Sequence, residues 1–255
     1  MRQMKEKLRI RAVDDTEIPA LHIKRGGKYL LIASHGITSE KTEEGLYERF
    51  VELLPASYDA ILFDFRGHGE SNLDSMKVTI AGELLDLMAV FRWARKQNYS
   101  AIDHVATSFG SSITLLAVSA YGLVFLRRVA FWNPVISYQN TFINGTPEWG
   151  KTFFNQTTKD ELADRAYTQI SDSKFRISAQ MTQELLLLHP ENVRWPESIP
   201  LFVLHGDQDT LVPVSDAKAY ARANNARIKI LEGVDHGFDH RANEAMQLTA
   251  SWLQE

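Results

Sequence analysis

The chain has no cysteine among its 255 residues, which excludes disulfide bonds, thiol nucleophiles and metal sites with cysteine ligands. Long apolar runs are also missing. The longest, Ile113 to Leu126, is interrupted by polar residues and is too short to cross a bilayer. The first eleven residues are charged and contain no apolar segment of the signal-peptide type. We therefore expect a cytoplasmic protein without a membrane span.

Charge of one sign is not in excess either. The 28 Lys and Arg residues against 32 Asp and Glu residues give a formal net charge of −4 and a pI near 6.1. This balance gives no indication of a nucleic-acid-binding surface. The length and a hydrophobic share of 44% suit one large α/β domain, with or without a modest insertion. We expect a monomer or a homodimer.

Buried strands and amphipathic helices alternate along most of the chain. Continuous apolar runs such as 29–33 are typical of strands buried on both faces. This alternation predicts an α/β fold, with a doubly wound, mostly parallel eight-stranded sheet flanked by helices. The expected strands are 8–12, 17–23, 29–33, 60–63, 102–106, 129–132, 201–204 and 228–231, the first two as an antiparallel pair. The expected helices are 43–54, 80–96, 110–121, 215–223 and 243–253.

Residues 134–199 break this alternation. A loop of that length without secondary structure is improbable in a compact domain. We expect a helical cap, with helices near 159–166 and 175–188, between two parts of a core formed by 1–133 and 200–255. It would cover the carboxyl edge of the sheet, where open α/β sheets bind ligands. Its aromatic residues line an acyl or aryl pocket or form the cap's own core: Tyr138, Phe142, Trp149, Phe153 and Phe154.

The segment Ala106-Thr107-Ser108-Phe109-Gly110 joins a predicted strand to a predicted helix. A serine on such a sharp corner has a strained backbone, and its hydroxyl projects clear of the sheet. The turn needs small neighbours, and Ala106 and Gly110 supply them, with alanine where glycine is usual. Ser108 is therefore the candidate nucleophile.

A serine hydroxyl needs a base, and the base needs an orienting partner. Asp209 follows the strand 201–204, and His236 follows the strand 228–231 on a glycine-flanked loop. Both therefore lie at the same edge of the sheet as Ser108, and the order Ser, Asp, His is that of α/β-hydrolases. Asp207 is the alternative acid. The spacing to Val212-Pro213 favours Asp209, and Asp207 is expected to bond amides of its own turn.

Five motifs occur in register: Ser34-His35-Gly36-Ile37, Asp64-Phe65-Arg66-Gly67-His68-Gly69-Glu70-Ser71, the Ser108 corner, Gly206-x-x-Asp209-x-x-Val212-Pro213 and Asp235-His236-Gly237. With them the chain resembles serine esterases of the α/β-hydrolase superfamily over nearly its whole length. The His-Gly and Asp-x-x-Gly-His-Gly-x-Ser motifs are similar to those of bacterial cinnamoyl (feruloyl) esterases. The segment from Asn133-Pro134 onward is similar to the acyl-chain thioesterases of bacterial luminescence systems. The resemblance implies that Ser108 is the nucleophile, His236 the base and Asp209 the acid.

The resemblance also implies an oxyanion hole formed by the backbone N–H groups of Phe109 and Ile37. His35 is expected to hold this loop in shape. The candidate substrate contacts are His35, Tyr138, Phe142, Trp149 and Phe153.

The remaining serines and histidines have simpler interpretations. Ser111 and Ser112 are expected to cap or pack the helix that follows Ser108. His205 is expected to bond the backbone at a strand end, and His68 to belong to its turn. His240 is expected at the surface or as a cap. No histidine pair has a typical zinc spacing, so no metal site is predicted.

These assignments predict hydrolysis of carboxylic esters with an aryl or medium-chain acyl group, through an acyl-enzyme and without a cofactor. The same triad would serve an acyl thioester, with acyl-CoA or an acyl carrier protein as the partner. A third interpretation is a ligand-binding relative that keeps the fold without turnover. Dehalogenases and epoxide hydrolases are disfavoured because those relatives carry Asp in place of the serine.

Overall fold

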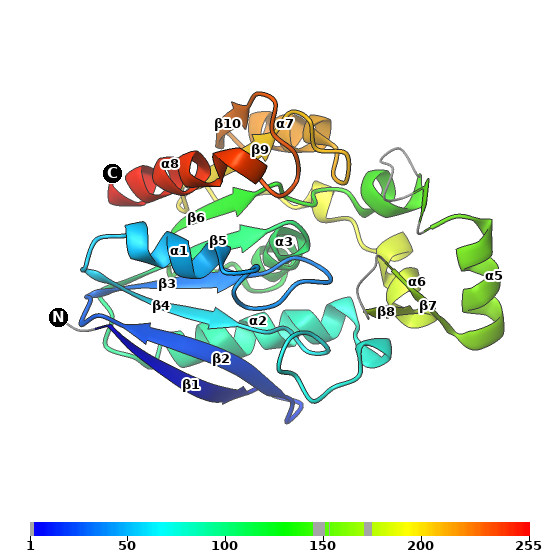
Figure 1. Ribbon diagram of the computed structural model, residues 1–255, viewed down its shortest axis with the longest axis horizontal. Coiled ribbons are helices and arrows are strands. Elements are labelled where there is room, and N and C mark those ends of the chain that lie inside the picture. Colours follow the sequence, from blue (N-terminus) through cyan, green and yellow to red (C-terminus); the bar gives the residue numbers. More distant parts are fainter. Residues whose placement is uncertain (1–2, 145–150, 153, 171–174) are drawn as a thin grey trace.

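The computed structural model describes residues 3–144, 151–152, 154–170 and 175–255. Eight strands form one sheet in the order β1-β2-β4-β3-β5-β6-β9-β10 (Figure 1). β2 is antiparallel to both of its neighbours, and all other pairs are parallel. The predicted mostly parallel, eight-stranded sheet is therefore confirmed. The strands are β1 (Met4–Arg11), β2 (Glu17–Lys24), β3 (Tyr29–Ser34), β4 (Tyr58–Phe63), β5 (Ala101–Thr107), β6 (Leu126–Trp132), β9 (Leu201–Gly206) and β10 (Arg227–Leu231).

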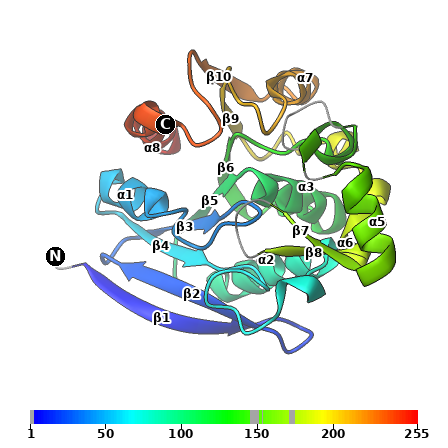
Figure 2. The same cartoon turned by 45° about the vertical axis from the view of Figure 1, so that its right-hand side comes forward.

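Helices cover both faces of this sheet (Figure 2). On β3, Leu30 and Ile32 point into one hydrophobic layer, whereas Leu31 and Ala33 point into the other. Both layers are buried, which is why the strand is an unbroken apolar run in the sequence. One layer contains α2 (Ile80–Ala94), α3 (Phe109–Tyr121) and α7 (Val214–Ala223), and the other contains α1 (Leu46–Leu53) and α8 (Ala242–Gln254). Within the described residues, no helix is both long and apolar enough to cross a membrane.

The first helix starts later than its periodicity predicts. A helix was expected from residue 43, but α1 begins at Leu46. Glu43, Glu44 and Gly45 have φ values of 48°, 55° and 84°, which lie in the left-handed region and cannot continue a right-handed helix. This turn places the Glu43 side chain at the carboxyl edge of the sheet instead of on a helix surface.

The described elements between β6 and β9 lie outside the large sheet, beyond the carboxyl ends of its central strands (Figure 1). Two short strands pair there, where a helix from residue 175 was expected. The side chain of Ser178 accepts a hydrogen bond from Met181 N–H, so the helix begins only after the strand. The described elements are η2 (Gln139–Ile143), α5 (Gln156–Arg165), β7 (Tyr167–Gln169), β8 (Arg176–Ser178), α6 (Ala179–Leu187) and η3 (Pro190–Asn192).

Polar contacts join this insertion to the start of α2 and to the segment that precedes it. The Glu184 carboxylate on α6 accepts a 2.5 Å hydrogen bond from Ile80 N–H at the start of α2, where the helix dipole favours negative charge. The Arg176 guanidinium pairs with Asp74 at 2.7 Å, and Arg176 N–H donates to Ser75 Oγ at 2.9 Å. The division into a core of 1–133 and 200–255 and a cap of 134–199 stays a prediction.

Candidate active site

Ser108 lies at the corner between β5 and α3. Its φ of 49° and ψ of −116° form a strained combination that costs about 1–3 kcal/mol. The corner is held because Ser108 N–H donates to Trp132 O at 2.8 Å and Val135 N–H donates to Ser108 O at 3.0 Å. Gly110 permits close packing, since a Cβ atom there would lie 2.6 Å from the backbone oxygen of His35. The strained serine corner predicted from the sequence is present.

Hydrogen bonds link Ser108 to two other loops. Nε2 of His236 lies 3.0 Å from Ser108 Oγ, and Nδ1 of His236 lies 2.7 Å from Oδ2 of Asp209. Because an ionised carboxylate can only accept, the imidazole proton lies on Nδ1 and the lone pair of Nε2 faces the serine hydroxyl. The neutral ring is therefore oriented to accept the serine proton.

The Asp209 side chain is fully enclosed and accepts hydrogen bonds on both oxygens. Oδ1 accepts from the N–H groups of Leu211 at 2.9 Å and Val212 at 2.8 Å. Oδ2 accepts from His236 and also lies 3.0 Å from Nε2 of His205. The expectation that His205 bonds to the backbone is therefore wrong, because its ring points at the carboxylate.

The alternative acid and the last histidine lie elsewhere. Asp207 Oδ1 accepts a 2.7 Å hydrogen bond from Gly233 N–H, on the loop after β10 and not in its own turn. His240 is exposed on the short helix η4 (Asp239–Arg241). The structure thus brings Asp209 to His236, and it leaves Asp207 and His240 away from that contact.

The charges around this chain of hydrogen bonds favour an ionised Asp209 carboxylate beside a basic His236 imidazole. Burial raises the pKa of Asp209, but the two adjacent histidine rings outweigh it and hold that pKa well below its usual range. Desolvation lowers the pKa of His236, but Asp209, with smaller contributions from Glu43 and Asp235, raises it above the ordinary histidine value. His236 is therefore a stronger base than a free histidine.

Two backbone N–H groups near Ser108 donate no hydrogen bond within the described residues. Phe109 is the first residue of α3, so its N–H has no acceptor within the helix. Ile37 lies in the loop after β3 and lines the cavity at Ser108. Neither N–H donates to another group in the described part of the chain. Both can therefore donate to a substrate oxygen, as the predicted oxyanion hole requires.

Hydrogen bonds from neighbouring residues fix the orientation of the Ile37 N–H group. Gly36 N–H donates to Glu43 Oε1 at 2.6 Å, and Gly36 O accepts from His35 Nδ1 at 2.8 Å. This carbonyl and the Ile37 N–H belong to one planar peptide group, so the bond from His35 fixes the direction of the N–H. Burial lowers the pKa of His35 to about 4, so its ring is neutral with the proton on Nδ1.

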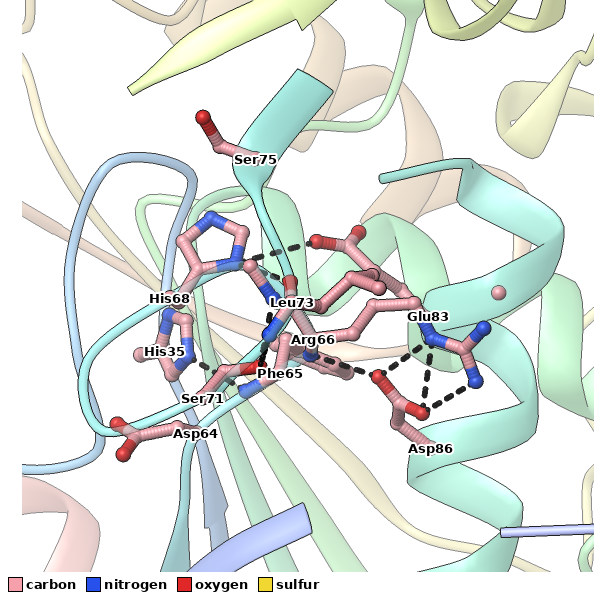
Figure 3. A network of polar contacts seen from close by, with 12 residues as sticks. His35, Asp64, Phe65, Arg66, His68, Ser71, Leu73, Ser75, Glu83 and Asp86 are labelled. Atoms are coloured by element: carbon pink, nitrogen blue, oxygen red, sulfur yellow. Dashed lines mark hydrogen bonds and ion pairs between the residues drawn. The ribbon is translucent and has the colours of Figure 1, made fainter. Parts of the chain in front are cut away.

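A polar network beneath the loop holds His35 (Figure 3). Its Nε2 accepts a 3.0 Å hydrogen bond from Phe65 N–H, and its ring centroid lies 5.0 Å from that of His68. His68 Nδ1 donates to Arg66 O at 2.9 Å, as expected for a turn histidine. The Arg66 guanidinium pairs with the buried Asp86 at 2.7 Å and anchors this turn on α2. His35 is 1% exposed, which fits loop support and leaves no surface for substrate contact.

A cavity of about 360 Å³ opens at Ser108. Among the described aromatic residues of the insertion, Phe142 lines it. The apolar lining residues are Ile37, Leu46, Val135, Phe142, Leu211, Val212 and Phe238. The polar ones, besides Ser108 and His236, include Thr38, Ser39, Glu43, Glu44, Arg49, Thr107 and Thr141.

The other aromatic residues proposed for the pocket have different positions. Tyr138 is fully buried, its ring stacks on Phe109 with centroids 5.4 Å apart, and its hydroxyl donates to Ser112. It belongs to the core and does not line the cavity. Trp149 and Phe153 lie outside the described residues. Ser111 and Ser112 are buried packing residues, as expected.

Sequence reasoning missed Glu43 and Asn133. Glu43 carried no signal because periodicity placed it on a helix. Asn133 Nδ2 donates to the backbone oxygen of His236, and its Oδ1 accepts from Gly206 N–H at 2.9 Å, so one side chain ties the ends of β6 and β9 to the histidine loop. Its φ of 43° is a conformation that asparagine tolerates, and an asparagine at a strand end before proline was the available signal. The described residues contain no cluster of three or more potential metal ligands.

Comparison with solved structures gives the fold. Est1E from Butyrivibrio proteoclasticus, with ferulic acid bound, has a TM-score of 0.80 at 18% identity, covering 97% of this chain and 98% of that one. The Pyrococcus furiosus esterase Pf2001 has a TM-score of 0.73 at 20% identity, covering 99% and 91%. The TM-scores establish a shared fold, and at identities below 25% they establish the fold alone.

Comparison of sequences gives the family. The non-reducing polyketide synthase Preu3 of Preussia isomera is 32% identical over 102 residues, 38% of this chain, and the chain spans about 4% of its length. Residues 28–241, which include Ser108, Asp209 and His236, match the family described as serine aminopeptidase, S33. The predicted superfamily and a serine hydrolase function are thus confirmed. The chain belongs to the serine aminopeptidase S33 family of α/β-hydrolases.

Proposed function

We propose that the protein hydrolyses carboxylic esters through an acyl-enzyme, with Ser108 as the nucleophile, His236 as the base and Asp209 as the acid that orients it. The observation that carries this proposal is the unbroken chain of hydrogen bonds from Ser108 Oγ to His236 (3.0 Å) and on to Asp209 (2.7 Å). It opens on a cavity large enough for a small substrate and beside two unused backbone donors.

In the acylation step, Ser108 Oγ attacks the ester carbonyl carbon while His236 Nε2 takes the hydroxyl proton. The carbonyl oxygen becomes negatively charged and accepts from Ile37 and Phe109 N–H, each such donor contributing roughly 3–4 kcal/mol. When the tetrahedral intermediate collapses, the bond to the alcohol oxygen breaks. The alcohol leaves with the proton from Nε2, and the acyl group stays on Ser108.

In the deacylation step, water attacks the acyl-enzyme and His236 Nε2 takes its proton. The proton then passes to Ser108 Oγ as the carboxylic acid leaves. Asp209 stays ionised throughout and stabilises the imidazolium that forms in each step. All proton transfers use His236, so this scheme needs no cofactor.

The rate is expected to follow the ionisation of His236. The imidazole must be neutral to accept the serine proton, so kcat/KM should rise with pH through one ionisation and then level off. Because the pKa of His236 is raised above the ordinary value of about 6.5, the midpoint should lie above that value. Measurement of kcat/KM between pH 5 and 9 checks this. A flat profile, with chemistry shown to limit the rate, would contradict histidine as the base.

The acyl group is proposed to be aryl or medium-chain. Phe142, Leu211 and Phe238 are among the apolar side chains that line the cavity, and its volume is too small for an extended polymer. An acyl thioester, on coenzyme A or an acyl carrier protein, would be cleaved by the same three residues. We would separate these classes by comparing kcat/KM for p-nitrophenyl esters, aryl esters, acyl-CoA thioesters and aminoacyl amides.

The same panel tests the proposal itself. An ester rate well above the thioester and amide rates supports it, and faster thioester or amide cleavage overturns the ester assignment. A fluorophosphonate probe separates an enzyme from a relative that only binds ligands. Rapid labelling at Ser108 is expected, because its hydroxyl donates a hydrogen bond to His236 Nε2, which activates it.

Phe142 is expected to set the acyl-length profile. It is 1% exposed and lines the cavity, so Phe142→Ala should enlarge the acyl site. Each acyl methylene buried in the site contributes about 0.8 kcal/mol. A larger site can bury more methylenes, so the optimum should move to longer acyl chains, while the rate on the acetyl ester changes little. The measurement is kcat/KM from acetyl to palmitoyl esters.

Tyr138→Phe is the matched control for this variant. It removes only a hydroxyl that donates to Ser112 in the core, so the chain-length profile should stay that of the wild type. If Phe142→Ala also keeps that profile, Phe142 contributes to packing and does not determine acyl length.

A further inference from the structure

His205, near the end of β9, is a second histidine on the catalytic carboxylate. Its side chain has no exposed surface, and its Nε2 lies 3.0 Å from Asp209 Oδ2. The same oxygen accepts from His236 Nδ1 at 2.7 Å. The proposed reaction assigns no step to His205, although it is one of four groups that donate to this carboxylate.

The proton position on the His205 ring follows from its surroundings. The Asp209 carboxylate can only accept, so Nε2 carries a proton. Nδ1 is buried and has no hydrogen-bond partner in the described part of the chain. An unpaired buried polar atom costs about 1–3 kcal/mol, which an apolar side chain of similar size would avoid. Packing alone therefore does not explain an imidazole here, and the one hydrogen-bond contact of this side chain within the described residues is with Asp209.

We propose that His205 is a positioning residue that holds Oδ2 of Asp209 where His236 Nδ1 meets it and shares the negative charge of that oxygen. The inference rests on the proposed triad. Without this donor, the backbone amides of Leu211 and Val212 would still fix Oδ1. Oδ2 would then be held by His236 alone, so the orientation of the base would loosen.

The shared charge also bears on the basicity of His236. The acidic groups that act on His236 are Asp209, Glu43 and Asp235, and they raise its pKa against desolvation. A donor on Oδ2 weakens the pull of Asp209 on the imidazolium proton. Removing His205 should therefore raise the pKa of His236 further and move the rising limb of the pH profile to higher pH. Asp216 is the other acidic group whose pKa His205 affects, and its carboxylate accepts a hydrogen bond from Asn140 Nδ2 in the insertion.

The test compares His205→Leu with His205→Gln, whose side-chain amide can donate from a position close to Nε2. In His205→Leu, kcat should fall by at least about tenfold, the expected effect of one lost hydrogen bond to a charged group. KM should stay nearly unchanged, and the kcat/KM ionisation should move to higher pH. His205→Gln should restore both kcat and the ionisation.

His22→Leu is the matched control. It removes a buried histidine of β2 whose Nε2 bonds Tyr99 Oη at 2.9 Å, and four strands lie between β2 and β9. It should leave kcat and the ionisation unchanged. Thermal unfolding of all three variants separates a loss of folded protein from a loss of rate.

A folded His205→Leu variant with wild-type kcat and ionisation overturns the inference. So does a folded His205→Gln variant that loses more than about tenfold in kcat, and that arm decides alone if the leucine variant does not fold. The Ser108→Ala variant separates this inference from the proposed function. If Ser108→Ala keeps its activity, the proposed function itself is overturned. If Ser108→Ala is inactive and His205→Leu behaves like the wild type, only this inference is overturned.

Discussion

Replacement of Ser108 by alanine is expected to lower kcat by about 10⁴-fold or more while the protein stays folded. The hydroxyl oxygen is the atom that forms the acyl bond, and no neighbouring group can replace it. Ser111 and Ser112 are fully buried, and their hydroxyls donate to backbone oxygens of Ala106 and Phe109. The measurement is kcat on a medium-chain p-nitrophenyl ester, together with the thermal unfolding temperature.

Ser111→Ala provides the control for this prediction. It also deletes a serine hydroxyl, three residues further along in the first turn of α3, where that hydroxyl donates a 3.0 Å hydrogen bond to Ala106 O. Its kcat should stay within a few-fold of wild type. A purified Ser108→Ala protein that keeps more than about a tenth of the activity would show that the nucleophile has been misassigned.

The sheet and the three central side chains could be predicted because their signals are local. A strand buried on both faces, such as β3, must be apolar at every position, so it stands out in the sequence. Parallel strands end at one edge, so residues just after β5, β9 and β10 meet there whatever the rest of the chain does. The chain order of Ser108, Asp209 and His236 then assigned each a role.

The features that were missed depend on contacts between distant segments. Helical periodicity continues through Glu43, whereas in the structure its carboxylate accepts hydrogen bonds from Gly36 N–H and Ser39 Oγ on the loop after β3, contacts that periodicity does not show. The β7 and β8 strands have three residues each, too few to show a period of two. His205 looked like any strand-end histidine, because the carboxylate it contacts is fixed by the folding of the next loop.

Asp209→Asn is expected to lower kcat by about 10³–10⁴-fold, because asparagine cannot keep the imidazole in the tautomer that accepts the serine proton. The structure makes this loss unavoidable. All four partners of the Asp209 carboxylate are donors, two on each oxygen. An asparagine amide therefore meets donors with its NH₂ group in either orientation, and a flip cannot relieve the conflict. If it faces His236, that ring must move its proton to Nε2.

Asp207→Asn is the matched comparison, two residues away in the same loop. Asp207 Oδ1 accepts a single backbone bond, from Gly233, and the carbonyl oxygen of asparagine can accept it equally well. We expect kcat within about threefold of wild type for this variant, since no group of the triad changes its partner. Both variants should be assayed at a pH above the His236 ionisation. If Asp207→Asn loses more activity than Asp209→Asn, the acid lies at Asp207 and the triad must be reassigned.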